Sequence, residues 1–129
     1  MLEAKVRGRK QYKIMKHIYI TIIAMIALSA ISFAKAYVVF GKNGSGKKTG
    51  YDVIEATNYS DALKYAKAQF PNAHSISANY FKNYALIYWS PKKNSYYMRH
   101  LDTKKGVEEE AEYQRKRGKT RIAYYSADL

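Results

Sequence analysis

The sequence predicts an α+β fold: a small antiparallel sheet of about five to six strands with one or two helices, preceded by an apolar N-terminal helix. Two observations carry this prediction. Short runs rich in Val, Ile, Tyr and Phe recur between turn signals from residue 37 onward, and two stretches show helical spacing. The expected order of elements is β-β-α-β-β-β-α-β.

The first two strands are expected on either side of a long loop. Residues 37–40 predict the first strand, and residues 51–56, rich in Val and Ile, predict the second. Residues 41–50 between them hold four glycines and three lysines. Since so few apolar side chains remain there, this stretch is predicted to be a basic hairpin loop outside the core.

A helix over residues 60–70 follows. Asn58 or Ser60 is expected to cap it, and Asp61 falls in its first turn, where a carboxylate is favourable. Pro71 ends it. Five residues recur at helical spacing and predict one apolar face: Tyr59, Ala62, Leu63, Ala66 and Phe70.

Three strands are expected next as a meander, over residues 75–80, 84–90 and 95–101. Turns are predicted at residues 82–83 and 91–94, the second one with a proline at a favoured position. Because both faces of residues 84–90 are apolar, the sequence leaves the order of the strands open.

The last two elements are a helix over residues 106–117 and a strand over residues 120–125. The acids of this helix precede its basic residues, which matches the helix dipole, and Gly118 is placed to end it. No internal repeat and no linker to a second domain is visible in the sequence.

Residues 1–36 are predicted to be an export or anchoring leader. Residues 1–16 hold six basic residues and one acid, and residues 18–34 form an uncharged run of 17 residues. Basic residues ahead of an apolar run favour a cytoplasmic N-terminus, so the remaining chain is expected on the far side of the inner membrane, periplasmic or secreted.

Two main interpretations of the leader stay open. Ala34 and Ala36 form an A-x-A cleavage site, which is typical of a signal peptide. A run of 17 residues also reaches the lower limit for a transmembrane anchor. A buried soluble helix is a third interpretation. In the first two, residues 37–129 form a single small α+β domain.

Composition excludes several classes of function. The chain of 129 residues has no cysteine, so disulfide scaffolds, thiol catalysis and cysteine-bound zinc are ruled out. Its formal charge is +13, and 47% of its residues are hydrophobic, too many for a disordered chain. Residues 37–129 keep 16 basic residues against nine acids, so the predicted domain is itself basic.

Residues 41–49 resemble a phosphate-binding P-loop only in part. Gly41, Gly46 and Lys47 fit the spacing, but Lys48 stands where the magnesium-binding hydroxyl belongs. A strand is expected to follow rather than the required helix. The loop lysines are therefore expected at most to hold an anion.

No catalytic constellation is convincing. His100 and Asp102 supply a base and a carboxylate, but no serine stands in a nucleophile-elbow context, and the three histidines lack metal-site spacing. We expect a protein that is not an enzyme and that needs no cofactor or metal ion.

Lysine and tyrosine residues interleave along the meander. Basic side chains attract anions, and Tyr and Trp are favoured at protein interfaces and stack on bases. The candidate binding residues, together with those of the glycine-rich loop, are Lys42, Lys47, Lys48, Tyr84, Tyr88, Trp89, Lys92, Lys93, Tyr96, Tyr97 and Arg99. An alternative interpretation assigns many of these rings to the core.

The leader, the basic domain and the lack of a catalytic site together predict a non-enzymatic exported or anchored envelope protein. Its expected partner is an envelope protein or an anionic polymer, in an inhibitor, immunity or exclusion role. The alternative is a membrane-tethered or secreted domain that binds nucleic acid. The sequence leaves the oligomeric state open.

Overall fold

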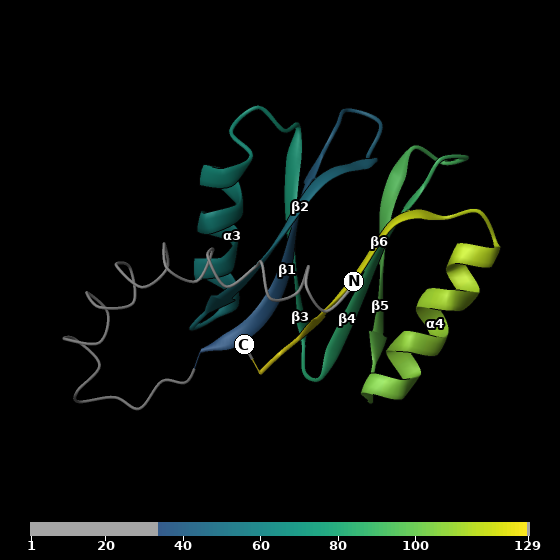
Figure 1. Ribbon diagram of the computed structural model, residues 1–129. Coiled ribbons are helices and arrows are strands. Elements are labelled where there is room, and N and C mark those ends of the chain that lie inside the picture. The colour runs from purple at the N-terminus through teal and green to yellow at the C-terminus, as the bar shows by residue number, and fades with distance from the viewer. Residues whose placement is uncertain (1–33, 129) are drawn as a thin grey trace.

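The computed structural model describes residues 34–128, and in this part of the chain two helices lie outside two sheets that pack face to face (Figure 1). The layers run from helix α3 through the sheet β2-β1-β3 and the sheet β5-β4-β6 to helix α4. The elements are β1 (Lys35–Lys42), β2 (Lys48–Ala56), α3 (Tyr59–Gln69), β3 (Ser75–Phe81), β4 (Tyr84–Ser90), β5 (Ser95–Leu101), α4 (Lys104–Lys116) and β6 (Thr120–Ser126).

The α+β class and the order of elements are confirmed, but the strands form two antiparallel sheets of three rather than one sheet. Each sheet is built by the same β-β-α-β unit. In each unit the first strand is central, the second and the last pair with its two edges, and the helix comes between those two. The two halves are thus a topological repeat, which the sequence does not reveal because so few of its residues recur.

The core consists of three apolar layers, and each of the two central strands, β1 and β4, contributes to two of them. Tyr37 and Val39 of β1 face α3, whereas Val38 faces the second sheet. In β4, Ile87 faces the first sheet and Leu86 faces α4. A central strand covered on both faces must be apolar on both, which explains why the alternation in residues 84–90 was ambiguous.

The edge strands β2 and β5 meet across the two sheets. The rings of Tyr51 and Tyr96 are 5.0 Å apart between centroids in an edge-to-face arrangement. The backbone N–H of Lys48 donates to the Ser95 hydroxyl oxygen at 3.0 Å. These contacts close one side of the interface between the two halves.

The first hairpin differs from the prediction, because Gly41 and Gly50 are paired strand residues and not part of a loop. The ring of Phe70 lies over both of them. A Cβ at Gly41 would come within 2.8 Å of Phe70 Cγ, and one at Gly50 within 2.9 Å of Phe70 Cε1. The connection is therefore only residues 43–47, where the Asn43 side chain accepts hydrogen bonds from two backbone N–H groups.

Helix α3 begins with Asn58, whose side chain accepts a hydrogen bond from the Asp61 N–H at 2.8 Å. Ala62 and Ala66 are fully buried on its apolar face, as the spacing predicts. Tyr59 does not belong to that face, because its side chain is 54% exposed.

Helix α4 starts two residues earlier than expected. The Thr103 side chain caps it by accepting a hydrogen bond from the Gly106 N–H at 2.9 Å. The first turn therefore carries Lys104 and Lys105 instead of acids, which corrects that part of the dipole argument. Gly118 follows the helix at φ 87°, where glycine is favoured.

The leader up to residue 33, and with it almost all of the predicted apolar helix, lies outside the described residues. Neither α3 nor α4 is long and apolar enough to cross a membrane. Of the predicted cleavage motif, Ala34 is exposed just before β1, whereas Ala36 lies within β1 and is 4% exposed. Ala36 is paired with Glu55 on one side and with Phe81 on the other.

Candidate functional site

A pocket of about 690 Å³ lies at one end of the second sheet. Two connections form its rim: the β4–β5 turn, with residues 90–93, and the α4–β6 connection, with residues 117–119. Tyr88 of β4 and Tyr97 of β5 line it from the sheet. Figure 1 shows that these two connections lie at the same end of the molecule.

The β4–β5 turn is held by Ser90. The Asn94 N–H donates to the Ser90 carbonyl oxygen at 2.7 Å, and the Lys93 N–H donates to the Ser90 hydroxyl oxygen at 3.1 Å. Asn94 adopts φ 53°, a left-handed conformation that asparagine tolerates better than most residues. The turn therefore presents Lys92 and Lys93, both exposed, at its outer edge.

The α4–β6 connection is shaped by the end of the helix. The Gly118 N–H donates to the Arg115 carbonyl oxygen, and the Lys119 N–H donates to the Gln114 carbonyl oxygen, both at 3.0 Å. This pair of bonds is the Schellman motif that reverses a chain after a helix. It brings Lys119 back over the sheet, with its Nζ 5.8 Å from the centroid of the Tyr88 ring.

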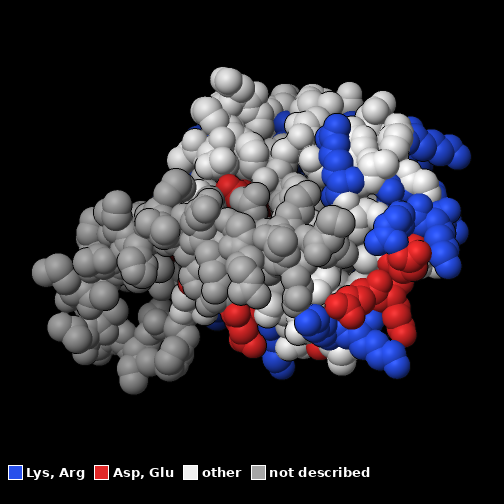
Figure 2. All heavy atoms as spheres, viewed as in Figure 1, with Lys and Arg blue, Asp and Glu red and all other residues white. Residues whose placement is uncertain are grey.

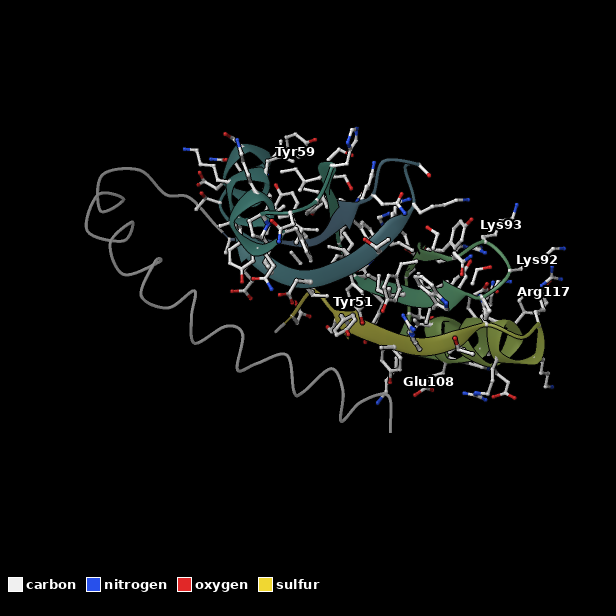
Figure 3. The ribbon with its side chains drawn as sticks, turned by 90° about the horizontal axis from the view of Figure 1, so that it is seen from above. Tyr51, Tyr59, Lys92, Lys93, Glu108 and Arg117 are labelled. Atoms are coloured by element: carbon white, nitrogen blue, oxygen red, sulfur yellow. The ribbon has the colours of Figure 1, made fainter. Side chains whose placement is uncertain are left out.

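The pocket is strongly basic. Lys92, Lys93, Arg117 and Lys119 line it, and none of its lining residues is acidic. In Figure 3, Lys92, Lys93 and Arg117 project at the same edge of the molecule from two separate connections. Figure 2 shows Lys and Arg side chains gathered over this side, with acidic side chains below them.

The floor of the pocket is aromatic. The rings of Tyr88 and Tyr97 stack with centroids 5.9 Å apart and 20° between their planes. Tyr88 is 7% exposed, and burial raises the pKa of its hydroxyl above the usual value. Its hydroxyl is therefore neutral at physiological pH, so the floor adds no negative charge that would oppose an anion.

Four of the eleven candidate binding residues meet in this pocket: Tyr88, Lys92, Lys93 and Tyr97. Alternation along the strands places Trp89 and Tyr96 on the opposite face of the sheet. Tyr84 and Arg99 share the face of Tyr88 but lie farther along it, and the three remaining lysines belong to the first hairpin. Tyr84, at the other end of β4, packs edge-to-face on Tyr124, with centroids 6.2 Å apart.

Trp89 and Tyr96 form a second aromatic group on the face of the sheet that points toward the first half. Their ring centroids are 4.9 Å apart. The Arg121 guanidinium lies 4.5 Å from the Trp89 centroid and 5.9 Å from that of Tyr96. Arg121 adopts φ 51° at an irregularity in the pairing of β6 with β4. These two rings therefore contact a cation of the chain itself.

The remaining predicted cations are dispersed. Arg99 forms an ion pair with Glu110 on α4 at 3.1 Å. Lys42 and Lys48 are paired across the first hairpin. Lys48 Nζ lies 5.3 Å from the Phe40 centroid, and burial, followed by repulsion from Lys42, lowers the pKa of Lys48. Lys47 lies in the turn of that hairpin.

Sequence reasoning missed Arg117 and Lys119. The sequence predicts only that the basic residues at the end of α4 complement the helix dipole. The available signal was the helix-ending Gly118, since a chain that reverses there returns its next residues to the sheet. His100 and Asp102 are both exposed. Within residues 34–128, no group of three or more His, Asp or Glu side chains is arranged to hold a metal ion.

Comparison of the chain with known protein families, with curated proteins and with solved structures finds no match.

Proposed function

We propose that the chain is a non-enzymatic envelope protein, held at the membrane by its leader, and that its folded domain binds an anionic partner. The partner is an envelope protein or an anionic envelope polymer. The observation that carries this proposal is the basic pocket, in which four cations from two connections line one concave site without an acid.

Such a cluster is not needed for stability. Like charges repel, so four neighbouring cations weaken the folded state unless something compensates them. The end of α4 accounts for some of the positive charge, because a helix C-terminus attracts cations. It does not account for Lys92 and Lys93, which belong to a separate hairpin. An anionic partner supplies the missing compensation.

Retention of the leader as an anchor is supported by the position of Ala36. Cleavage after this residue would remove the first two residues of β1, the central strand of its sheet. The new N-terminal ammonium would then belong to Tyr37, which is 4% exposed. Burying an unpaired charge is costly, so a cleaved domain would be less stable than an anchored one.

Cell fractionation with an intact mass tests the anchor. We would express the full chain with a C-terminal tag and measure the tagged species in each fraction. A full-length species in the membrane fraction supports the proposal. A soluble exported species that begins at Tyr37 overturns the anchor, and a full-length cytosolic species overturns export.

Co-purification from solubilised envelopes tests the binding role. The bait is the full chain, compared with K92Q/K93Q and with K64Q/K67Q. The control pair removes the same charge from the exposed face of α3, in the other half of the molecule. Recovery of a partner with the wild type and the control, but not with K92Q/K93Q, supports the proposal. Equal recovery with all three overturns it.

Nucleic acid is the alternative partner that the same cations favour. However, Tyr84, Trp89 and Tyr96 do not join the pocket as a stacking surface for bases. A salt titration of oligonucleotide binding separates the two. Tight binding that weakens steeply as salt rises favours nucleic acid, because phosphate contacts release counterions.

A further inference from the structure

We propose that the basic pocket is a binding site for a phosphate monoester, with the phosphate held by the lysines and Arg117 and the organic group lying on the tyrosine floor. This inference rests on the proposed function and names the ligand of the same site. The ligand comes from outside the bilayer in which the chain is anchored.

The repeat shows that the pocket is open in only one half of the molecule. On the face that the helix covers, the last pair of the first hairpin is Gly41 with Gly50, just before the irregular Lys42–Lys48 pair. On the corresponding face of the second hairpin, the last pair is Ser90 with Ser95. In the first half, Phe70, which ends α3, covers its glycine pair directly. The same fold unit can therefore fill this position with a ring.

In the second half the residue that ends the helix is Arg117, and it does not fill the position. Its guanidinium lies 5.3 Å from the centroid of Tyr113 and donates to the hydroxyl of that residue at 3.0 Å. A space of about 690 Å³ remains beside it. At the position that the Phe70 ring fills in the first half, the second half has an open pocket lined by cations. This difference is expected if the second half binds a ligand there and the first half does not.

Charge and volume together favour a phosphate ester. A phosphate monoester carries roughly −1.5 to −2 at neutral pH and offers three acceptor oxygens, which suits several cations better than one carboxylate does. The pocket falls within the range of about 300–1,000 Å³ that is typical of small-molecule sites, and it greatly exceeds a bare phosphate. Tyr97 and Pro91 supply most of the surface for an organic group, with the buried ring of Tyr88 stacked against Tyr97.

The position of the pocket, at the end of the domain away from the leader, favours a ligand other than the lipids of the anchoring bilayer. Lys35 begins β1 at the end of the molecule where β3 ends and β4 begins, because Ala36 pairs with Phe81 and Tyr84 follows three residues later. The pocket lies at the opposite end of β4, beside the β4–β5 turn, and Figure 1 shows this turn at the other end of the strand from its start. Seven strand residues span about 23 Å, well beyond the Debye length of about 8 Å at physiological salt.

Titration calorimetry on the full-length chain in a non-ionic detergent tests this inference. The probes are phenyl phosphate, inorganic phosphate and phthalate, which carries about the same charge as phenyl phosphate but no phosphate group. Vesicles with phosphatidylglycerol test the lipid source. The variants are K92Q/K93Q, R117F, which puts a ring where Phe70 stands in the first half, and R117Q in case R117F does not fold. K64Q/K67Q is the matched control.

We expect phenyl phosphate to bind more tightly than inorganic phosphate and about tenfold or more tighter than phthalate. K92Q/K93Q and R117F should each weaken the binding of phenyl phosphate about tenfold or more, R117Q less, and K64Q/K67Q not at all. Equal affinity for phthalate, an equal loss in the control, or binding to vesicles alone overturns the inference.

The two proposals fail separately. Lysine-dependent recovery of an envelope partner without saturable binding of any phosphate probe overturns the phosphate site and leaves the proposed function standing. Saturable binding of phenyl phosphate without any such partner supports the site and overturns the envelope-binding role.

Discussion

The packing of Phe70 on Gly41 predicts a destabilisation that depends on the ring. In a Gly41→Ala variant the new Cβ would lie 2.8 Å from Phe70 Cγ and 3.0 Å from its Cβ. Since carbon atoms pack at about 3.5–4.0 Å, Phe70 must move by roughly 0.5–1 Å. Its Cβ is fixed to the backbone, so the ring cannot simply rotate away.

The magnitude follows from two opposing effects. Overpacking costs about 1–3 kcal/mol, whereas replacing a strand glycine by alanine gains about 0.5–1 kcal/mol in backbone entropy. Gly41→Ala should therefore lower the free energy of unfolding by about 1 kcal/mol, within a range of about 0–2.5 kcal/mol. In a Phe70→Ala background the clash is absent, and the same substitution should stabilise the domain by about 0.5 kcal/mol.

Urea unfolding of the full chain in detergent measures these free energies. Trp89, the only tryptophan of the chain, is half-buried against Tyr96 and Arg121 and reports unfolding by fluorescence. The coupling energy of the double-mutant cycle is expected at about 1–3 kcal/mol. Gly44→Ala is the control, because a Cβ at that loop position meets no atom within 4 Å. If Gly41→Ala costs the same with and without the ring, Phe70 does not pack on Gly41.

Three further predictions concern other parts of the domain. Asn58→Ala should cost about 1 kcal/mol in urea unfolding through loss of the α3 cap, whereas Ser60→Ala should cost less than about 0.5 kcal/mol; equal costs would contradict the assigned cap. Ala36→Asp should cost about 3 kcal/mol or more by burying a carboxylate, and Ala34→Asp almost nothing; a tolerated aspartate at residue 36 would place that residue outside the core. Burial raises the pKa of Tyr88, so above pH 10 the unfolded chain loses this proton first and stability falls as pH rises. The Tyr88→Phe variant should therefore lose stability less steeply as pH rises above about 10, and an unchanged slope would contradict the assigned cause.

The sequence predicts elements well where local chemistry decides them. The strands over residues 84–90 and 95–101 begin and end as expected, because turn signals bound both of them. Asn58, Pro71 and Gly118 mark helix ends through their own backbone and side-chain preferences. Such signals act within a few residues and need no knowledge of the fold.

The arrangement of the sheets and the site depends on contacts far apart in the sequence. Residues 84–90 are apolar on both faces because a helix covers one and a sheet the other, and a single sheet with a helix on each face would produce the same pattern. Lys93 and Arg117 are brought to one pocket only by the reversal after α4. A local pattern therefore identified half of the rim and could not identify the other half.

The link between the two halves is short, because only Lys82 and Asn83 connect β3 to β4. The inner face of each sheet is covered by the sheet of the other half. The second half of one chain can therefore pack on the first half of another chain in the same way. Exchange of this kind is domain swapping, and two-fold reciprocal exchange closes into a dimer. Light scattering on concentrated, stored protein would detect it as a dimer fraction that increases with concentration. Such a dimer would carry two copies of the basic pocket and would bind a polyvalent partner with an avidity that the single chain lacks.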